Sequence, residues 1–410
     1  MELILRNARI AGDPSRGAVD IGIADGRIAA IAPNLAAEGR ELQLGGKLVA
    51  PGLIETHIHL DKSRIIERCT PEAGRDAQAM QRVAAVKRAA SFTPEDVFAR
   101  GARTLEQCIA HGTTHMRTHV EVDPGVGMRG FEGVQALVEA YRWAIDIELC
   151  VFPQEGLINN PETDPLLVQA LQRGARVIGA APGFDTDHAG QIDRIFALAR
   201  EFDVDVDMHL DSGDTADDLD IHHVCALTER YGWGGRVAVG HETKIAALDP
   251  PRLMALARKL ADVGVAVTVL PATDLFMRGR KVPYNGTRGV TPAHLLVKEG
   301  CNCSLSTNNV LNPFTPFGDG SLLRMANLYA TVCQASAPED LRECFAMLTT
   351  RSARLMRLEA YGIAVGRPAD LIVLDCADPK DAVAELIEPL YGFKRGRQTF
   401  TRQPAVLHRP

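Results

Sequence analysis

Residues 48–61 decide the fold, and they read LVAPGLIETHIHLD. The apolar run at 48–54 predicts a buried strand, which is followed at once by His57 and His59. Side chains two residues apart on a strand point the same way, so both imidazoles can bind one ion. Imidazole is a preferred ligand of zinc and ferrous iron, and the pair therefore predicts half of a metal site.

The composition is that of a globular chain and argues against several classes of protein. The 410 residues are 46% hydrophobic and 24% charged, which is enough for one large catalytic domain and a smaller one. The formal net charge of −7 argues against a nucleic-acid partner, whose binding surface would be basic. No apolar stretch is long enough to cross a bilayer and the first residues do not resemble a signal peptide, so we expect a cytoplasmic protein without a membrane partner.

Apolar runs and helical patterns alternate through the middle of the chain. Eight β/α alternations over about 300 residues are what a (β/α)8 TIM barrel needs, although a doubly wound sheet would also alternate. We therefore predict an α/β fold of the TIM-barrel type. Its strands are expected at 48–59, 113–120, 147–153, 176–181, 204–210, 236–241, 265–270 and 302–306, with helices between them such as 95–110, 132–143, 188–201 and 251–262.

Both ends of the chain carry short strand signals. Residues 3–10 alternate, and 19–23 lead through the Asp25-Gly26 turn into 28–31. Similar runs return at 369–375 and near the C-terminus. The two ends therefore predict one small β-sandwich, formed by 1–48 and 359–410, around a barrel at 49–358.

Polar residues recur where the predicted strands end, which is where a barrel carries its functional groups. Alternation along 204–211 places Asp207, His209 and Asp211 on one face of a strand. Buried charge is costly unless it is paired or bound to metal, so the set predicts a metal site. The candidates at the other strand ends are His57, His59, Arg117, His119, Gln154, Glu155, His241, Glu242, Asn308 and Asn309.

The chain resembles the amidohydrolase superfamily, within the branch of cytosine deaminase and N-isopropylammelide amidohydrolase. The resemblance covers nearly the whole chain. The matching stretches are 51–63, 116–120, 151–156, 207–209, 240–241, 312–313, 316–318 and 361–366.

The resemblance implies a barrel that holds one divalent transition metal, zinc or iron. Its metal ligands would be His57, His59 and His209. Gln154 would hydrogen-bond an amide-like ring edge of the substrate, and His241 would orient or deprotonate the attacking water. Lys62 would polarise a ring carbonyl, the alternative being a surface cation. His119 and Asn308 complete the candidate substrate contacts.

The chain departs from the family pattern at two positions that handle protons. The strand-eight aspartate of the family falls at Asn308, and the glutamate three residues after the strand-five histidine falls at Ser212. A neutral amide binds a divalent cation more weakly than a carboxylate and cannot act as a base near neutral pH. We therefore expect His241 to be the base, with Asp211 as acid and base beside it.

The predicted function is hydrolysis of a C–N bond by a metal-activated water, with a cytosine-like nitrogen heterocycle as the small-molecule substrate and a homo-oligomer as the working form. Two alternatives remain, a ring-opening hydrolase of cyclic amides and a ligand-binding relative without catalysis. A third, a dinucleotide-dependent oxidoreductase, rests on the glycine-rich stretch 125–130, and Pro124 speaks against it. The loop at 273–290 should shape the pocket through Phe276, Met277, Arg278, Arg280 and Tyr284.

Overall fold

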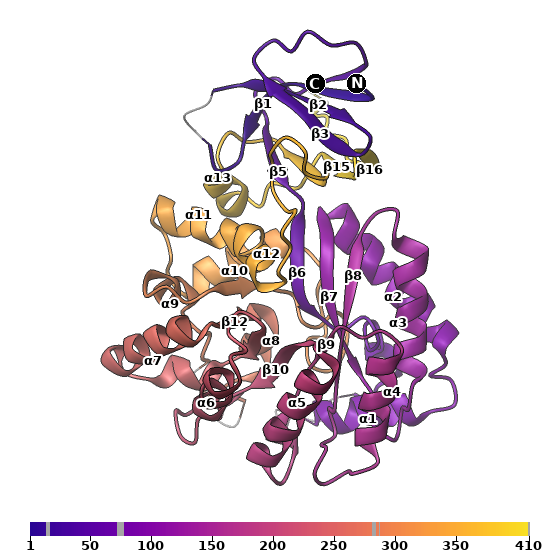
Figure 1. Ribbon diagram of the computed structural model, residues 1–410, viewed down its shortest axis with the longest axis vertical. Helices are drawn as coiled ribbons and strands as arrows, with labels where there is room; N and C mark the ends of the chain where they lie inside the picture. The colour runs from indigo at the N-terminus through magenta and orange to yellow at the C-terminus, as the bar shows by residue number, and fades with distance from the viewer. Residues whose placement is uncertain (14–16, 72–77, 281–283, 287, 409–410) are drawn as a thin grey trace.

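Two sheets organise the computed structural model, which describes residues 1–410 except 14–16, 72–77, 281–283, 287 and 409–410. One is a barrel of eight parallel strands, and the other is an eight-stranded terminal sheet built from both ends of the chain. Figure 1 shows the terminal sheet above the barrel, with both chain ends beside it. The predicted fold class is confirmed.

Each barrel strand pairs in parallel with the next, and a bridge between Ile58 and Asn308 joins the last segment to the first strand. The glycine-rich stretch 125–130 connects two consecutive elements of this barrel, which excludes the open sheet that the dinucleotide-binding alternative needs. The barrel strands are β6 (Leu53–Ile58), β7 (Thr113–Glu121), β8 (Asp146–Phe152), β9 (Val177–Ile178), β10 (Asp205–Leu210), β11 (Val237–His241), β12 (Val265–Val269) and β13 (Cys303–Leu305).

Helices cover the barrel and bury their apolar faces against its strands. Capping signals fix their ends: Asp249 accepts a hydrogen bond from the N–H of Arg252, and Gly264 ends the same helix with a φ of 75°. None of the described helices is long and apolar enough to span a membrane. The helices are α1 (Ala79–Arg88), α2 (Pro94–Ala110), α3 (Arg129–Tyr141), α4 (Thr163–Gln172), α5 (His188–Phe202), α6 (Ile221–Tyr231), α7 (Pro250–Val263), α8 (Pro271–Met277), α9 (Ala293–Lys298), α10 (Leu322–Val332), α11 (Pro338–Ala346), α12 (Thr350–Leu355) and α13 (Pro379–Ala384).

The terminal sheet joins strands from the two ends of the sequence around its own buried core. In its centre β5 lies between β1, to which it is parallel, and β14, to which it is antiparallel. Its strands are β1 (Leu3–Ile10), β2 (Val19–Ala24), β3 (Arg27–Ala32), β4 (Arg40–Gln43), β5 (Leu48–Pro51), β14 (Leu371–Leu374), β15 (Tyr391–Lys394) and β16 (Arg397–Thr401).

The strand predicted at 48–59 is in fact two strands in two different sheets. Gly52 separates β5 from β6, and a Cβ atom there would lie 2.2 Å from the side chain of Thr114 on β7. The chain can therefore pass between the sheets only at a residue without a side chain. The boundary between the terminal sheet and the barrel consequently falls at Gly52 and not at residue 48.

Candidate active site

A cavity of about 300 Å³ opens at the carboxyl ends of the barrel strands. This is the end at which a (β/α)8 barrel gathers its functional groups. The cavity brings together residues from distant parts of the sequence because each follows, or ends, a different strand. They include His59, Gln154, His209, His241, Thr273 and Asn308.

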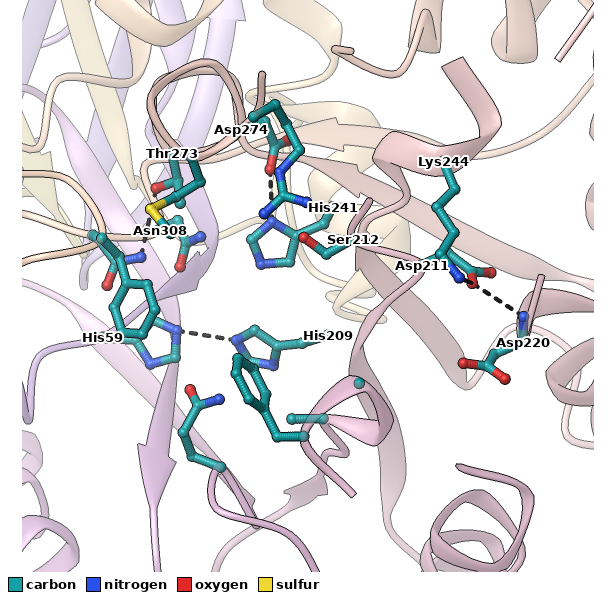
Figure 2. Close-up of a pocket in the computed structure, with 18 of the residues that line it drawn as sticks. His59, His209, Asp211, Ser212, Asp220, His241, Lys244, Thr273, Asp274 and Asn308 are labelled. Atoms are coloured by element: carbon teal, nitrogen blue, oxygen red, sulfur yellow. Dashed lines mark hydrogen bonds and ion pairs between the residues drawn. The ribbon is translucent and has the colours of Figure 1, made fainter. Parts of the chain in front are cut away.

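Three predicted metal ligands converge beside this cavity. The Nε2 atom of His209 lies 3.1 Å from Nε2 of His57 and 3.1 Å from Nε2 of His59. Figure 2 shows His59 and His209 facing each other. The spacing suits nitrogens that surround one ion at about 2.1 Å. His241 adds a fourth imidazole, since its ring nitrogen and those of His57 and His209 lie within 4.8 Å of one another.

These imidazoles are neutral, as metal ligands must be. Burial lowers the pKa of His57, His59 and His209 well below the ordinary value, and repulsion between the neighbouring rings lowers it further. The Nδ1–H of His59 donates to the carbonyl oxygen of His119 at 3.2 Å. That bond leaves the lone pair on Nε2 of His59, which is the atom that faces His209. The described residues therefore fit a metal ion in both geometry and protonation.

His119 packs between His57 and Asp207. Its ring stacks on His57 with centroids 3.7 Å apart, and its Nε2 lies 3.4 Å from Oδ1 of Asp207. Burial alone would raise the pKa of Asp207, but His119 and Arg117 hold it below the ordinary value. Because His119 is fully buried and does not line the cavity, we replace its predicted substrate contact with a role in holding His57.

His241 is oriented by Asp274, a residue that the sequence analysis missed. Oδ1 of Asp274 accepts a hydrogen bond from Nδ1 of His241 at 2.6 Å, and Figure 2 shows the pair. A carboxylate that accepts this bond places the proton on Nδ1, so Nε2 of His241 keeps its lone pair. Asp274 lies on α8 just beyond β12, so its position after a predicted strand was the one signal that could have found it.

Asp211 does not point at the histidines as the strand alternation predicted. It follows β10 with a φ of 44°, which turns its side chain aside. Its carboxylate accepts the backbone N–H groups of Asp220 at 3.0 Å and Ile221 at 2.9 Å, and Lys244 Nζ lies 3.5 Å away. Figure 2 shows Asp211 beside Lys244 and Asp220. Burial raises its pKa, and these contacts hold Asp211 at the start of α6 although it also lines the cavity.

Lys62 lines the cavity from within the protein. It is 1% exposed, so the surface-cation alternative is wrong. Its Nζ donates to Oε1 of Glu121 at 2.6 Å and to Oε1 of Gln154 at 3.3 Å. An ammonium can only donate, so the Gln154 oxygen is occupied and its NH2 group is left for a ligand. Glu121, which also pairs with the buried Lys87, lies one residue beyond the predicted strand and was missed.

Asn308 lies where the barrel closes. Its backbone N–H donates to the carbonyl oxygen of His57 at 2.9 Å, and the N–H of His59 donates to the carbonyl oxygen of Asn308 at 2.9 Å. Both polar atoms of the Asn308 side chain are buried without a hydrogen-bond partner among the described residues. Thr307 donates to Glu55 at 2.6 Å and so anchors this segment, while burial raises the pKa of Glu55 to about 7. The structure thus keeps an unpaired amide beside the histidines.

The loop after β12 contributes two of its five predicted contacts to the cavity. Met277 and Arg278 line it, whereas Tyr284 is 81% exposed. Phe276 packs edge-on against Phe317, and Arg280 lies over the Phe276 ring at 4.8 Å. Residues 281–283 and 287 of this loop lie outside the described residues.

Known proteins match the chain over most of its length. The model of the amidohydrolase family matches residues 130–400. The chain is 28% identical over 406 residues to N-isopropylammelide isopropyl amidohydrolase of Pseudomonas sp. (strain ADP). This alignment covers 97% of this chain and 96% of the relative. It is 27% identical over 361 residues to a pterin deaminase of Rhizobium rhizogenes, covering 86% and 81%. The structure of 5-methylcytosine deaminase from Klebsiella pneumoniae liganded with 5-fluorocytosine superposes with a TM-score of 0.92 at 27% identity, over 99% of each chain. The chain therefore belongs to the amidohydrolase family of hydrolases, which act on carbon–nitrogen bonds.

Proposed function

We propose that the protein is a metal-dependent aminohydrolase that removes an amino group from a cytosine-like nitrogen heterocycle. The convergence of the Nε2 atoms of His57, His59 and His209 at the edge of the cavity carries this proposal. The names of the relatives add to it, since they describe deaminases of pterin and 5-methylcytosine and an amidohydrolase of N-isopropylammelide.

The three histidines would hold one divalent ion, zinc or iron. Bound there, the ion would supply a Lewis acid that activates water and polarises the carbon under attack. The oxygen of the Asn308 amide faces no partner and lies beside the same histidines, so it can assist as a weak ligand or contact the substrate. These assignments give a function to every buried imidazole on the cavity side of the barrel.

His241 would move the proton. Its Nε2 accepts the proton of water while the water oxygen bonds to the ring carbon, and it then gives that proton to the departing nitrogen. The C–N bond breaks, releasing ammonia or amine, and the proton left on the attacking oxygen passes to the adjacent ring nitrogen, so that the product carries a ring carbonyl and a ring N–H. Asp274 is a positioning residue in this scheme, because its hydrogen bond to Nδ1 holds the ring in place and fixes the tautomer in which Nε2 faces away from the carboxylate.

Gln154 and Lys62 would bind the ring. The Gln154 oxygen already accepts a hydrogen bond from Lys62, so its NH2 group is left to donate to a ring carbonyl or ring nitrogen. Lys62 uses two of its three N–H bonds for Glu121 and Gln154. The third can polarise a ring carbonyl.

The test combines metal analysis with a substrate screen. The purified, metal-supplied protein is incubated with cytosine, 5-methylcytosine, pterin and N-isopropylammelide, and the released ammonia or isopropylamine is measured. We expect about one zinc or iron per chain, lost in His57→Ala, and amine release from at least one ring. Loss of a ring compound without amine would indicate ring opening. A protein that takes up no metal would be the ligand-binding relative.

A further inference from the structure

Among the described residues, the charged side chains on the cavity wall have partners of opposite charge or hydrogen-bonded acceptors, with one exception. The exception is Arg278, for which neither an ion pair nor a side-chain hydrogen bond occurs in the part of the chain that the structure describes. The paired groups are Lys62 with Glu121 at 2.6 Å, Lys244 with Asp211 at 3.5 Å, His188 with Asp220 at 2.8 Å and His241 with Asp274 at 2.6 Å.

The position of Arg278 is fixed by the element that also orients the proposed base. It follows α8 directly, and its backbone N–H donates to the carbonyl oxygen of Asp274 at 3.0 Å. The Nε atom of its guanidinium is buried and has no hydrogen-bond partner among the described residues. Arg278 also lines the cavity, so a ligand there can pair with the outer nitrogens of its guanidinium.

We infer that the site takes a nitrogen heterocycle that carries an anionic substituent, such as a carboxylate, and that Arg278 binds this anion. This inference rests on the proposed function and names its substrate class. A guanidinium is always charged and presents a planar fork of donors that matches a carboxylate. Asp274 accepts a hydrogen bond from His241, and Asp211 is held by α6 and Lys244. No ion pair joins either carboxylate to Arg278 in the described part of the chain, so an anionic group of the substrate can supply its counter-ion.

The test compares two ligands that differ by a carboxylate, orotate and uracil, on the metal-supplied protein by titration calorimetry. A charge-assisted bond adds affinity, so the wild type should bind orotate at least about tenfold more tightly than uracil. Arg278→Met should remove that preference and change uracil binding less than about twofold, because only the anion contact is lost. Arg278→Lys should keep part of it, since the charge stays and the fork is lost. Arg252→Met is the matched control, an exposed cation on α7 that should leave the ratio unchanged.

Two results would overturn the inference. One is equal binding of orotate and uracil by the wild type. The other is an orotate preference that survives in Arg278→Met, because the carboxylate would then be bound elsewhere, for example on the metal. The proposed function is judged separately by amine release. Release from neutral rings without an orotate preference rejects only the anion site, and the converse rejects only the aminohydrolase activity.

Discussion

Two clusters of histidine and carboxylate residues lie at opposite ends of the barrel strands, and they differ in whether a lysine side chain of the protein lies at their centre. At the amino ends of β7 and β8, His115 and Asp146 meet Asp370 around Lys394, whose Nζ lies 2.8 Å from both carboxylates. At the carboxyl ends, the histidines of the cavity face one another through Nε2 atoms. Residue types that bind metals thus indicate a metal site only where the protein does not supply its own cation.

The electrostatics of the two clusters follow from this difference. Burial alone would raise the pKa of Asp146, but the Lys394 ammonium holds it below the ordinary value. Burial and the same ammonium lower the pKa of His115 to about 4. The Lys394 cluster, made of His115, Asp146, Asp370 and Lys394, is therefore compensated within the protein, and it ties β15 of the terminal sheet to the barrel. The cavity cluster, made of His57, His59 and His209, consists of imidazoles whose lowered pKa suits them to bind a cation.

The largest expected effect comes from removing a histidine of the cavity cluster. His209→Ala removes the imidazole that lies 3.1 Å from both other ligands, so bound metal and turnover should both be lost. Elemental analysis of the purified variant measures the first. The matched control is His115→Gln in the Lys394 cluster, which should keep the metal content of the wild type. Metal loss in both variants would contradict the distinction drawn here.

Removing the lysine of the Lys394 cluster should instead lower the free energy of unfolding. Lys394→Met removes the buried ammonium from Asp370, whereas Asp146 keeps its ion pair with Arg395, so the free energy of unfolding should fall by about 3 kcal/mol. Chemical denaturation of the variant measures this, and elemental analysis should find its metal content unchanged. A variant as stable as the wild type would show that Lys394 does not compensate Asp146 and Asp370.

A smaller effect is expected from the carboxylate that orients His241. Asp274→Asn replaces the carboxylate with an amide whose NH2 group can donate to Nδ1 and shift the imidazole proton to Nε2, so kcat should fall about 100-fold while metal is retained. Asp211→Asn is the same chemical change on another carboxylate of the wall, and it should change kcat less than about threefold because Asp211 binds the backbone of α6. Equal losses in the two variants would return Asp211 to the mechanism.

The smallest expected effect is tighter metal binding by the cavity cluster. Asn308→Asp places a carboxylate where the structure has an unpaired amide, and the chelator concentration that removes half of the metal should rise about tenfold. Asn309→Asp is the control, because the Asn309 oxygen already accepts a hydrogen bond from Asn312 at 2.7 Å. An unchanged chelator curve for Asn308→Asp would place its side chain outside the metal site.

The sequence predicts the barrel and the histidines well because both depend on short-range periodicity. Strand and helix patterns place His57, His59, His209 and His241 at strand ends, and the parallel barrel then brings strand ends together. The contacts of two carboxylates, Asp211 and Asp274, are harder to predict. Asp211 and Asp274 both follow strands, but which one meets a histidine depends on a positive φ at Asp211 and on the docking of α6 and α8. Such tertiary contacts leave no local pattern.

The passage of the backbone through Gly52 also has a consequence for how the chain folds. β5 is made before its partner β14, which follows only after the whole barrel. Until that partner emerges, β5 presents an unpaired edge, which is a site where chains pair wrongly with one another. Pairing of such distant segments is slow. Closing the terminal sheet is thus a step at which nascent chains expose an edge that favours aggregation.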